Sequence, residues 1–236
     1  MFPSDINFHQ HTPHVLVVDN FYRNPEQVRQ EALSQKFEED VRFYKGKRST
    51  YKHLLPYVKE EFERLLNVKI TDWILQPANG IFQITTKKDP LVWHSDHQDY
   101  AGAIYLTPNA NTPDSYNEGT SFWRDKKYGY RRPPQELTAE KDEVHKIKKS
   151  KSKTKNKKGK RIPTNKIKSS PITAVQMCNE IYSEYNLTHP DNWELIDKVG
   201  AVYNRLVLWD AKMIHSASQY GDKERLVQLF FFSIAK

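Results

Sequence analysis

The sequence predicts a mainly β fold with supporting helices, an α+β chain whose strands form a jelly roll of two packed sheets. Short runs rich in β-branched and aromatic residues recur from residue 73 to about residue 123 and again near the end of the chain. In the last run, RLVQLFFF, apolar residues occupy both alternating faces, which is typical of a strand covered on both sides. Two segments in the first third of the chain show helical signals instead, so helices should support one sheet.

The N-terminal elements are well marked. A first strand is predicted at HVLVVDNF, residues 14–21. Asn24, Pro25 and Gln27 then supply an N-cap, a proline at the first helical position and a polar residue at the third. This pattern predicts a helix that continues to about Ser34.

A second helix is predicted from Lys52 to Asn67, because its apolar residues recur at helical spacing. These residues are Leu54, Leu55, Val58, Phe62, Leu65 and Leu66. Strands are predicted from Trp73 to about Trp123, and a later helical stretch is predicted from Ser170. Turn residues separate the strands at 78–80, 108–109 and 118–119. Two long strands, within VGAVYNRLVLWDA and RLVQLFFF, should close the chain.

The basic residues of the chain are concentrated in one segment. Residues 141–170 contain thirteen Lys or Arg against two acidic residues, a local excess of +11 in a chain of net charge +8. The segment has no apolar periodicity, so it is predicted to be a disordered or solvent-exposed insertion. Its charge could attract nucleic acid or another acidic surface. No aromatic residue interleaves the lysines to stack on bases, which favours a solvated loop.

Composition limits the class of protein. A chain of 236 residues fits one domain, 1–236, with a sizeable core. No apolar stretch is long enough to span a bilayer, and the first residues lack the pattern of a secretory signal. Cys178 is the only cysteine, so neither an internal disulfide nor a cysteine zinc site can form. These features predict a soluble cytoplasmic protein.

His94 and Asp96 stand one residue apart in LVWHSDHQDY, after the strand-like run NGIFQITT. Side chains alternate along a strand, so both could point at one ion, whereas His97 has the opposite parity. Two imidazoles and a carboxylate form the facial triad of non-heme Fe(II) oxygenases, and His215 in KMIHSASQY could be the third ligand. Arg225, ten residues later, offers a planar fork of donors suited to a dicarboxylic acid such as 2-oxoglutarate.

With these four residues in order, the chain resembles the Fe(II)/2-oxoglutarate-dependent dioxygenase superfamily, on its prolyl-hydroxylase-like branch. The resemblance extends from HVLVVDNFYRNPEQV through WHSD, AGAIYLTPN, GTSFW and YNRLVLWDAKMIHSA to RLVQLFFF. Within the superfamily the chain is most similar to a group of bacterial and viral oxygenase-like proteins that share the GTSFW, YNRLV and RL-x-QLFFF blocks. The resemblance implies a distorted double-stranded β-helix, a cupin-like jelly roll with the metal between its sheets.

The resemblance also implies Fe(II) as the metal, 2-oxoglutarate and O2 as cosubstrates, and ascorbate as a candidate reductant. The catalytic iron ligands would be His94, Asp96 and His215, and Arg225 would bind the distal carboxylate of 2-oxoglutarate. Tyr105 falls where relatives place a second hydrogen-bond donor, although a core tyrosine is an equally good interpretation.

Gln83, in the strand before the ligand pair, lies near where relatives place a polar contact to the metal-binding end of the cosubstrate. The implied reaction couples oxidative decarboxylation of 2-oxoglutarate to hydroxylation, here of an amino-acid residue in a peptide or protein, with a small-molecule substrate left open. An oxygenase acting on nucleic acid is an alternative, but such demethylases carry several arginines after the last histidine, and RLVQLFFF holds only Arg225. A non-catalytic jelly-roll binding or structural protein is the other alternative.

Overall fold

The structure is a computed structural model that describes residues 13–39, 46–108, 117–132 and 189–235. The lysine-rich segment 141–170 and the helical stretch predicted from Ser170 lie outside the described residues.

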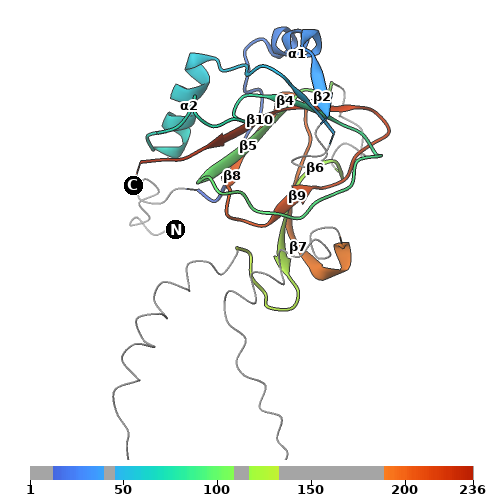
Figure 1. Cartoon of the computed structure of the whole chain (residues 1–236). Coiled ribbons are helices and arrows are strands. Elements are labelled where there is room, and N and C mark those ends of the chain that lie inside the picture. The colour runs from blue at the N-terminus through green and yellow to red at the C-terminus, as the bar shows by residue number, and fades with distance from the viewer. Residues whose placement is uncertain (1–12, 40–45, 109–116, 133–188, 236) are drawn as a thin grey trace, which may run out of the picture.

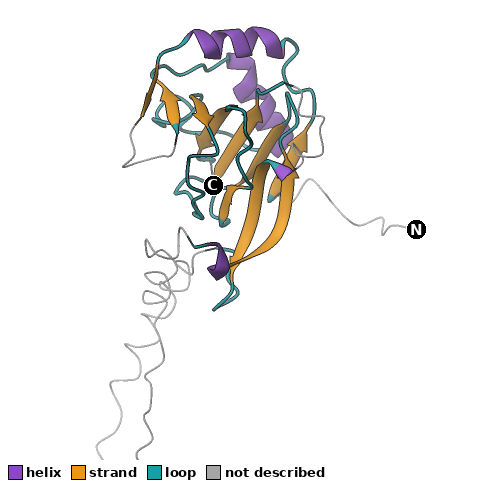
Figure 2. Cartoon of the chain, turned by 90° about the vertical axis from the view of Figure 1, so that its right-hand side faces the viewer, coloured by secondary structure: helices purple, strands orange, loops and turns teal. Residues whose placement is uncertain are grey.

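The described chain forms two antiparallel sheets, and two helices cover the larger one (Figure 1). The elements are β1 (Val15–Val18), α1 (Pro25–Ser34), β2 (Phe37–Glu39), β3 (Lys47–Ser49), α2 (Pro56–Leu66), β4 (Phe82–Thr85), β5 (Tyr100–Tyr105), β6 (Gly119–Asp125), the short 3-10 helix η3 (Pro190–Asn192), β7 (Trp193–Gly200), β8 (Leu206–Asp210), β9 (His215–Ala217) and β10 (Arg225–Phe232). The larger sheet has the order β1-β8-β5-β10-β4-β3-β2, and the smaller has the order β7-β6-β9. This arrangement confirms the predicted mainly β, jelly-roll fold with supporting helices. In the turned view of Figure 2, the longer helices lie in the upper part of the molecule, and a short helical turn lies at the lower end of the strands.

Helix α1 agrees with the sequence prediction at both ends. The side chain of Asn24 accepts a hydrogen bond of 3.2 Å from the backbone N–H of Gln27, and Pro25 is the first helical residue. The cap satisfies one of the backbone donors that every helix leaves free at its N-terminus.

Helix α2 begins at Pro56, four residues later than predicted. The ring of a proline disfavours helical dihedrals in the residue before it, and Leu55 accordingly has φ −78° and ψ 128°. Leu54 and Leu55 therefore fit the apolar pattern of the helix without belonging to it. The predicted end is correct, because Asn67 caps the helix in a left-handed conformation with φ 53°.

The predicted strands are shorter than their sequence patterns. No strand begins at Trp73, and among the described residues of this region the first strand is β4 at Phe82, after a turn-rich segment in which Asn79 donates to the Trp73 carbonyl at 2.6 Å. The predicted strand VGAVYNRLVLWDA is divided between β7 and β8. The break includes Asn204, whose φ of 63° is compatible with asparagine but not with a continuing strand.

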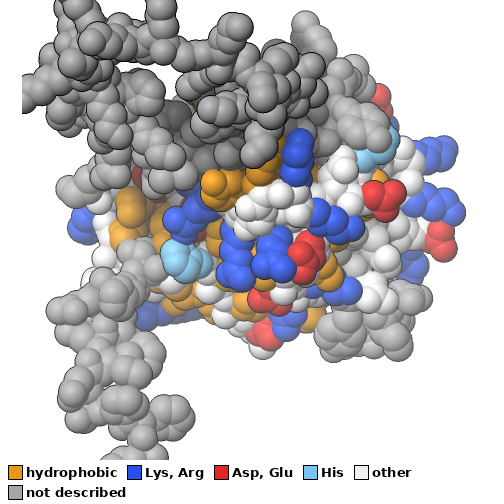
Figure 3. Space-filling view, turned by 90° about the horizontal axis from the view of Figure 1, so that it is seen from below, with side chains coloured by type: hydrophobic (Ala, Val, Ile, Leu, Met, Phe, Trp, Pro, Cys, Tyr) orange, Lys and Arg blue, Asp and Glu red, His pale blue; other side chains and the backbone are white. Residues whose placement is uncertain are grey.

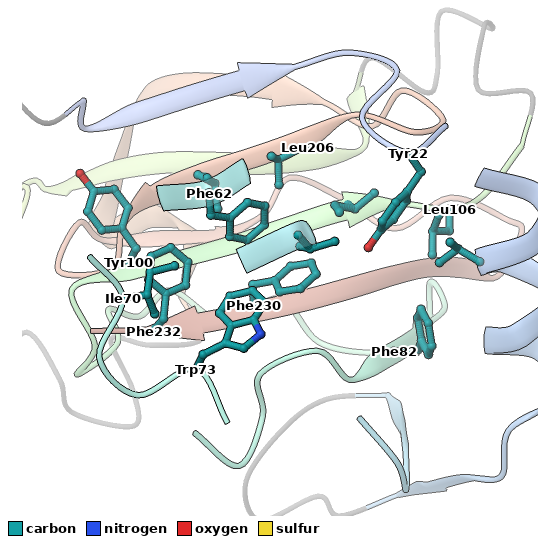
Figure 4. Packing of buried hydrophobic residues seen from close by; sticks show 14 of the residues in the cluster. Tyr22, Phe62, Ile70, Trp73, Phe82, Tyr100, Leu106, Leu206, Phe230 and Phe232 are labelled. Carbon is teal, nitrogen blue, oxygen red and sulfur yellow. The ribbon is translucent and has the colours of Figure 1, made fainter. Parts of the chain in front are cut away.

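The core on the helix side of the larger sheet is rich in aromatic residues. Phe62 of α2 is fully buried, and its ring centroid lies 5.0 Å from that of Phe230 and 5.6 Å from that of Trp73 (Figure 4). Phe232 and Tyr100 continue this cluster with rings stacked at 5.7 Å. Such edge-to-face and stacked pairs add to the stabilisation that comes from burying the rings.

A second core lies between the two sheets. Phe122 of the smaller sheet packs there with Tyr105, Trp209 and Val227 of the larger one. Strand β10 therefore contributes Val227 and its alternate neighbours to this core and Phe230 and its alternate neighbours to the helix side. The alternation predicted for the last strand is confirmed.

Gln228 is a fully buried polar residue on the helix side of β10. Its side-chain oxygen accepts from the Tyr22 hydroxyl at 2.5 Å, and its side-chain nitrogen donates to the His53 carbonyl at 2.7 Å. Both ends of the amide are therefore satisfied, as a buried polar group requires.

The surface carries both signs of charge. Lys and Arg side chains lie among Asp and Glu on the face seen in Figure 3, and pairs such as Arg124 with Glu194, at 2.8 Å, form between exposed side chains of β6 and β7. None of the described helices has the length and apolar character needed to cross a membrane.

The packing of Phe62 yields a first prediction. Phe62→Ala should lower the free energy of unfolding by about 3–5 kcal/mol, because it leaves a cavity among four aromatic rings. Urea denaturation would measure this change. The control is Leu33→Ala on α1, where the leucine is 46% exposed and the cost should stay within about 0.5 kcal/mol. Equal losses in both variants would contradict the described core.

Candidate metal centre

Three predicted ligands come together between β9 and the segment before β5. His215 opens β9, and His94 pairs with it through two backbone hydrogen bonds, His94 N–H to His215 O at 3.0 Å and His215 N–H to His94 O at 2.8 Å. Asp96 is fixed by its own backbone N–H, which donates to the Ala211 carbonyl at 2.8 Å. His94 and Asp96 were expected on a regular strand, but only a single isolated bridge forms at His94.

The side chains of these residues converge on one point. One ligand atom from each of His94, Asp96 and His215 lies within 4.8 Å of the other two, and no other group of this kind occurs among the described residues. The two histidine rings are 4.4 Å apart between centroids. His97, the exposed alternative with the opposite parity, is not part of the group.

Backbone carbonyls set the tautomer of both histidines. His94 Nδ1 lies 3.1 Å from the Val92 carbonyl, and His215 Nδ1 lies 2.8 Å from the Met213 carbonyl. A carbonyl can only accept, so each Nδ1 carries a hydrogen, and in the neutral ring Nε2 then presents a lone pair. This second contact is the one by which proteins orient metal-binding histidines.

The charge of Asp96 also suits the binding of a metal ion. Burial raises the pKa of Asp96, but His215, His94 and Arg48 outweigh that effect and bring it to about 2. Burial and the neighbouring His215 lower the pKa of His94. At neutral pH the group therefore combines a carboxylate with a neutral imidazole at His94, which are the protonation states that bind a divalent cation.

One contact favours a cation at this place. Asp96 Oδ2 is buried and has no hydrogen-bond partner among the described residues, yet it lies 3.3 Å from His215 Nε2. In the neutral tautomer that has its hydrogen on Nδ1, His215 presents a lone pair on Nε2, so both of these atoms carry lone pairs. A positive ion between them would turn an unfavourable contact into shared coordination.

Arg225 lies at the start of β10, directly opposite Thr85 of β4. Its side chain is buried, at 8% exposure, and its Nη2 donates to the Gly119 carbonyl at 3.4 Å. Neither Arg225 Nε nor Thr85 Oγ1 has a hydrogen-bond partner in the described part of the chain. Two uncommitted buried polar groups on facing residues are suited to a carboxylate.

Tyr105 and Gln83 share the face of the larger sheet on which Arg225 lies. The guanidinium carbon of Arg225 is 5.2 Å from the centroid of the Tyr105 ring, and the Tyr105 hydroxyl pairs with Thr120 Oγ1 at 2.7 Å. Burial raises the pKa of Tyr105, although Arg225 opposes this, so the phenol keeps its proton. Gln83 is half-buried and opposes Val227.

Sequence reasoning missed Thr85, Arg48 and Trp209. Arg48 of β3 opposes Gln83, and its charge lowers the pKa of both His94 and Asp96. The Trp209 ring lies 5.0 Å from the His215 ring and forms part of the wall behind it. No motif marks these residues, because their places depend on cross-strand register and not on spacing along the chain.

No protein-family model matches the chain, and no curated protein matches it. Among solved structures, the chain is similar to HygX from Streptomyces hygroscopicus with nickel, 2-oxoglutarate and hygromycin B bound, at 15% identity and a TM-score of 0.45, over 94% of this chain and 83% of that one. HygX with nickel and 2-oxoglutarate bound gives 14% identity and a TM-score of 0.42 over the same shares of the two chains. The Fe(II)/(alpha)ketoglutarate-dependent dioxygenase TqaL gives 12% identity and a TM-score of 0.40, over 94% of this chain and 86% of that one.

Proposed function

We propose that the chain is an Fe(II)- and 2-oxoglutarate-dependent dioxygenase that hydroxylates an amino-acid residue in a peptide or protein. The observation that carries this proposal is the group formed by His94, Asp96 and His215, whose ligand atoms lie within 4.8 Å of one another. Two imidazoles and one carboxylate leave further positions of an octahedral ion open, as an oxygenase requires.

Arg225 distinguishes this proposal from other uses of a two-histidine, one-carboxylate site. A buried arginine whose Nε is not committed within the described residues favours a ligand with a carboxylate. A cosubstrate that binds the metal at one end and a guanidinium at the other would be a 2-oxo acid with a second carboxylate. 2-Oxoglutarate has this form.

Each residue then has a defined part in the reaction. Neutral His94 and His215 would bind Fe(II) through Nε2, held in orientation by the Val92 and Met213 carbonyls, and anionic Asp96 would complete the set. The bound iron and 2-oxoglutarate would supply the oxidising chemistry, in which O2 is reduced as 2-oxoglutarate becomes succinate and carbon dioxide.

The surroundings of His215 would limit the access of water from that side of the ligands. Trp209 packs edge-on against His215, and Phe122 is fully buried beside Trp209, with ring centroids 6.1 Å apart. Exclusion of water strengthens electrostatic contacts in the site and protects a reactive centre from side reactions. Tyr105 and Gln83 would assist at the cosubstrate, Tyr105 near Arg225 and Gln83 on the same sheet face.

The peptide or protein substrate follows from the resemblance to the prolyl-hydroxylase-like branch. An oxygenase acting on nucleic acid ranks below it, because the described part of β10 after Arg225 holds no further arginine. A non-catalytic binding protein of the same fold would not need the ligand group and the buried Arg225 together.

Cosubstrate turnover tests the proposed function directly. Metal-free protein would be mixed anaerobically with Fe(II) and 2-oxoglutarate, and we expect the weak visible charge-transfer band of a chelated complex. Succinate should form after air is admitted, even slowly without a primary substrate. Metal-loaded protein that shows neither the band nor succinate would favour the non-catalytic binding protein.

The ligand assignment predicts the effect of single substitutions. His94→Ala and His215→Ala should each weaken Fe(II) binding at least about a hundredfold, because removing a ligand costs no less than removing one of its outer contacts. Anaerobic equilibrium dialysis would measure bound iron. His97→Ala is the matched control and should bind iron as the wild type does. Unchanged iron content in both ligand variants would exclude this site.

Arg225→Gln should leave iron binding intact and weaken 2-oxoglutarate binding about thirtyfold or more, because it removes one charge of a buried pair. Anaerobic titration of the iron-loaded protein gives the dissociation constant. The analogue 2-oxobutyrate has no distal carboxylate, so its binding should change little in the variant. Equal weakening of both acids would contradict the assigned role.

A further inference from the structure

Tyr220 brings a second aromatic ring to Arg225. It is half-buried and lies in residues 218–224, which connect β9 to β10. The guanidinium carbon of Arg225 is 5.9 Å from the Tyr220 ring centroid, compared with 5.2 Å from that of Tyr105. Both distances are within the range of cation–π attraction, about 6 Å. Arg225 thus contacts rings from two separate parts of the fold.

The connection that carries Tyr220 is fixed to the smaller sheet. Ser218 N–H donates to the Gly119 carbonyl at 3.1 Å, and the same carbonyl lies 3.4 Å from Arg225 Nη2. Gly221 lies beside the carboxylate of Glu118, the residue before β6. The carbonyl of Gly119, the first residue of β6, therefore contacts both the connection that carries Tyr220 and the guanidinium of Arg225.

The chemistry of this contact suits a site that must accept an anion. An aromatic face attracts a guanidinium without neutralising it, whereas a carboxylate in the same place would occupy its donors. Burial raises the pKa of Tyr220, with Arg225 opposing and Asp89 adding to the effect, so the ring carries no charge at neutral pH. The Nε donor of Arg225 has no partner in the described structure and remains available.

We propose that Tyr220 is a positioning residue for the carboxylate-binding end of the site. Its ring shields Arg225 from solvent and holds the guanidinium so that its uncommitted donors meet the distal carboxylate of a dicarboxylic 2-oxo acid. This inference rests on the proposed function. The proposed role requires the ring and not the hydroxyl, so the variant Tyr220→Phe should keep it.

Three variants of the full-length chain test the inference: Tyr220→Phe, Tyr220→Leu and Tyr220→Ala. The probes are 2-oxoglutarate and 2-oxobutyrate, each titrated anaerobically into iron-loaded protein. Tyr220→Ala should raise the dissociation constant for 2-oxoglutarate about tenfold. Tyr220→Leu, which keeps apolar bulk without a ring, should raise it about threefold, and Tyr220→Phe should stay within about twofold of the wild type. The dissociation constant for 2-oxobutyrate and the iron content should be unchanged in all three.

The two acids separate positioning from general structure. If Tyr220→Ala or Tyr220→Leu weakens both acids equally, the residue supports the fold only, and the inference is wrong. It is also wrong if 2-oxoglutarate binds all three variants as it binds the wild type while Arg225→Gln binds it poorly. If the wild type itself does not bind 2-oxoglutarate, the proposed function fails and this inference fails with it. The wild-type and Arg225→Gln titrations together therefore show which of the two statements has failed.

Discussion

The reciprocal backbone hydrogen bonds between His94 and His215 join two parts of the chain that no continuous sheet connects. Strand β9 is an edge strand of the smaller sheet, and the segment of His94 covers the side of it that β6 leaves open. Unpaired edges attract other chains, so this bridge satisfies backbone groups and sets the spacing of two imidazoles at once. Asp96 depends on it as well, because only Ser95 separates it from His94 along the chain.

The electrostatic character of the site follows from this placement. Carbonyl groups at Val92 and Met213 turn the imidazole lone pairs inward, and the low pKa of Asp96 keeps a negative charge beside them. Arg225 places a positive group on the same side of the larger sheet, in contact with aromatic rings. The space between the sheets thus has an electron-rich group and a cationic group, which would orient an unsymmetrical ligand in only one direction.

The sequence predicts those features that depend on local periodicity. It predicts the two faces of β10, the N-cap of α1 and the parity that separates His97 from His94 and Asp96. It places the start of α2 wrongly because apolar spacing cannot show that Pro56 excludes Leu55 from the helix. Thr85 and Arg48 cannot be found from spacing at all. They reach the site through the pairing of β4 with β10 and of β3 with β4, between segments far apart in sequence.

Gln228 influences the site by fixing the register of β10, although its side chain lies on the other face of the sheet. Sliding β10 by one residue against β4 and β5 would turn Arg225 toward the helices and remove Gln228 from the Tyr22 hydroxyl and the His53 carbonyl. A buried amide without partners is costly, whereas the phenylalanines of this strand would accept either side with little loss. The side-chain amide of Gln228 therefore favours one register of the mostly apolar strand β10. That register also sets the side of the sheet toward which Arg225 points.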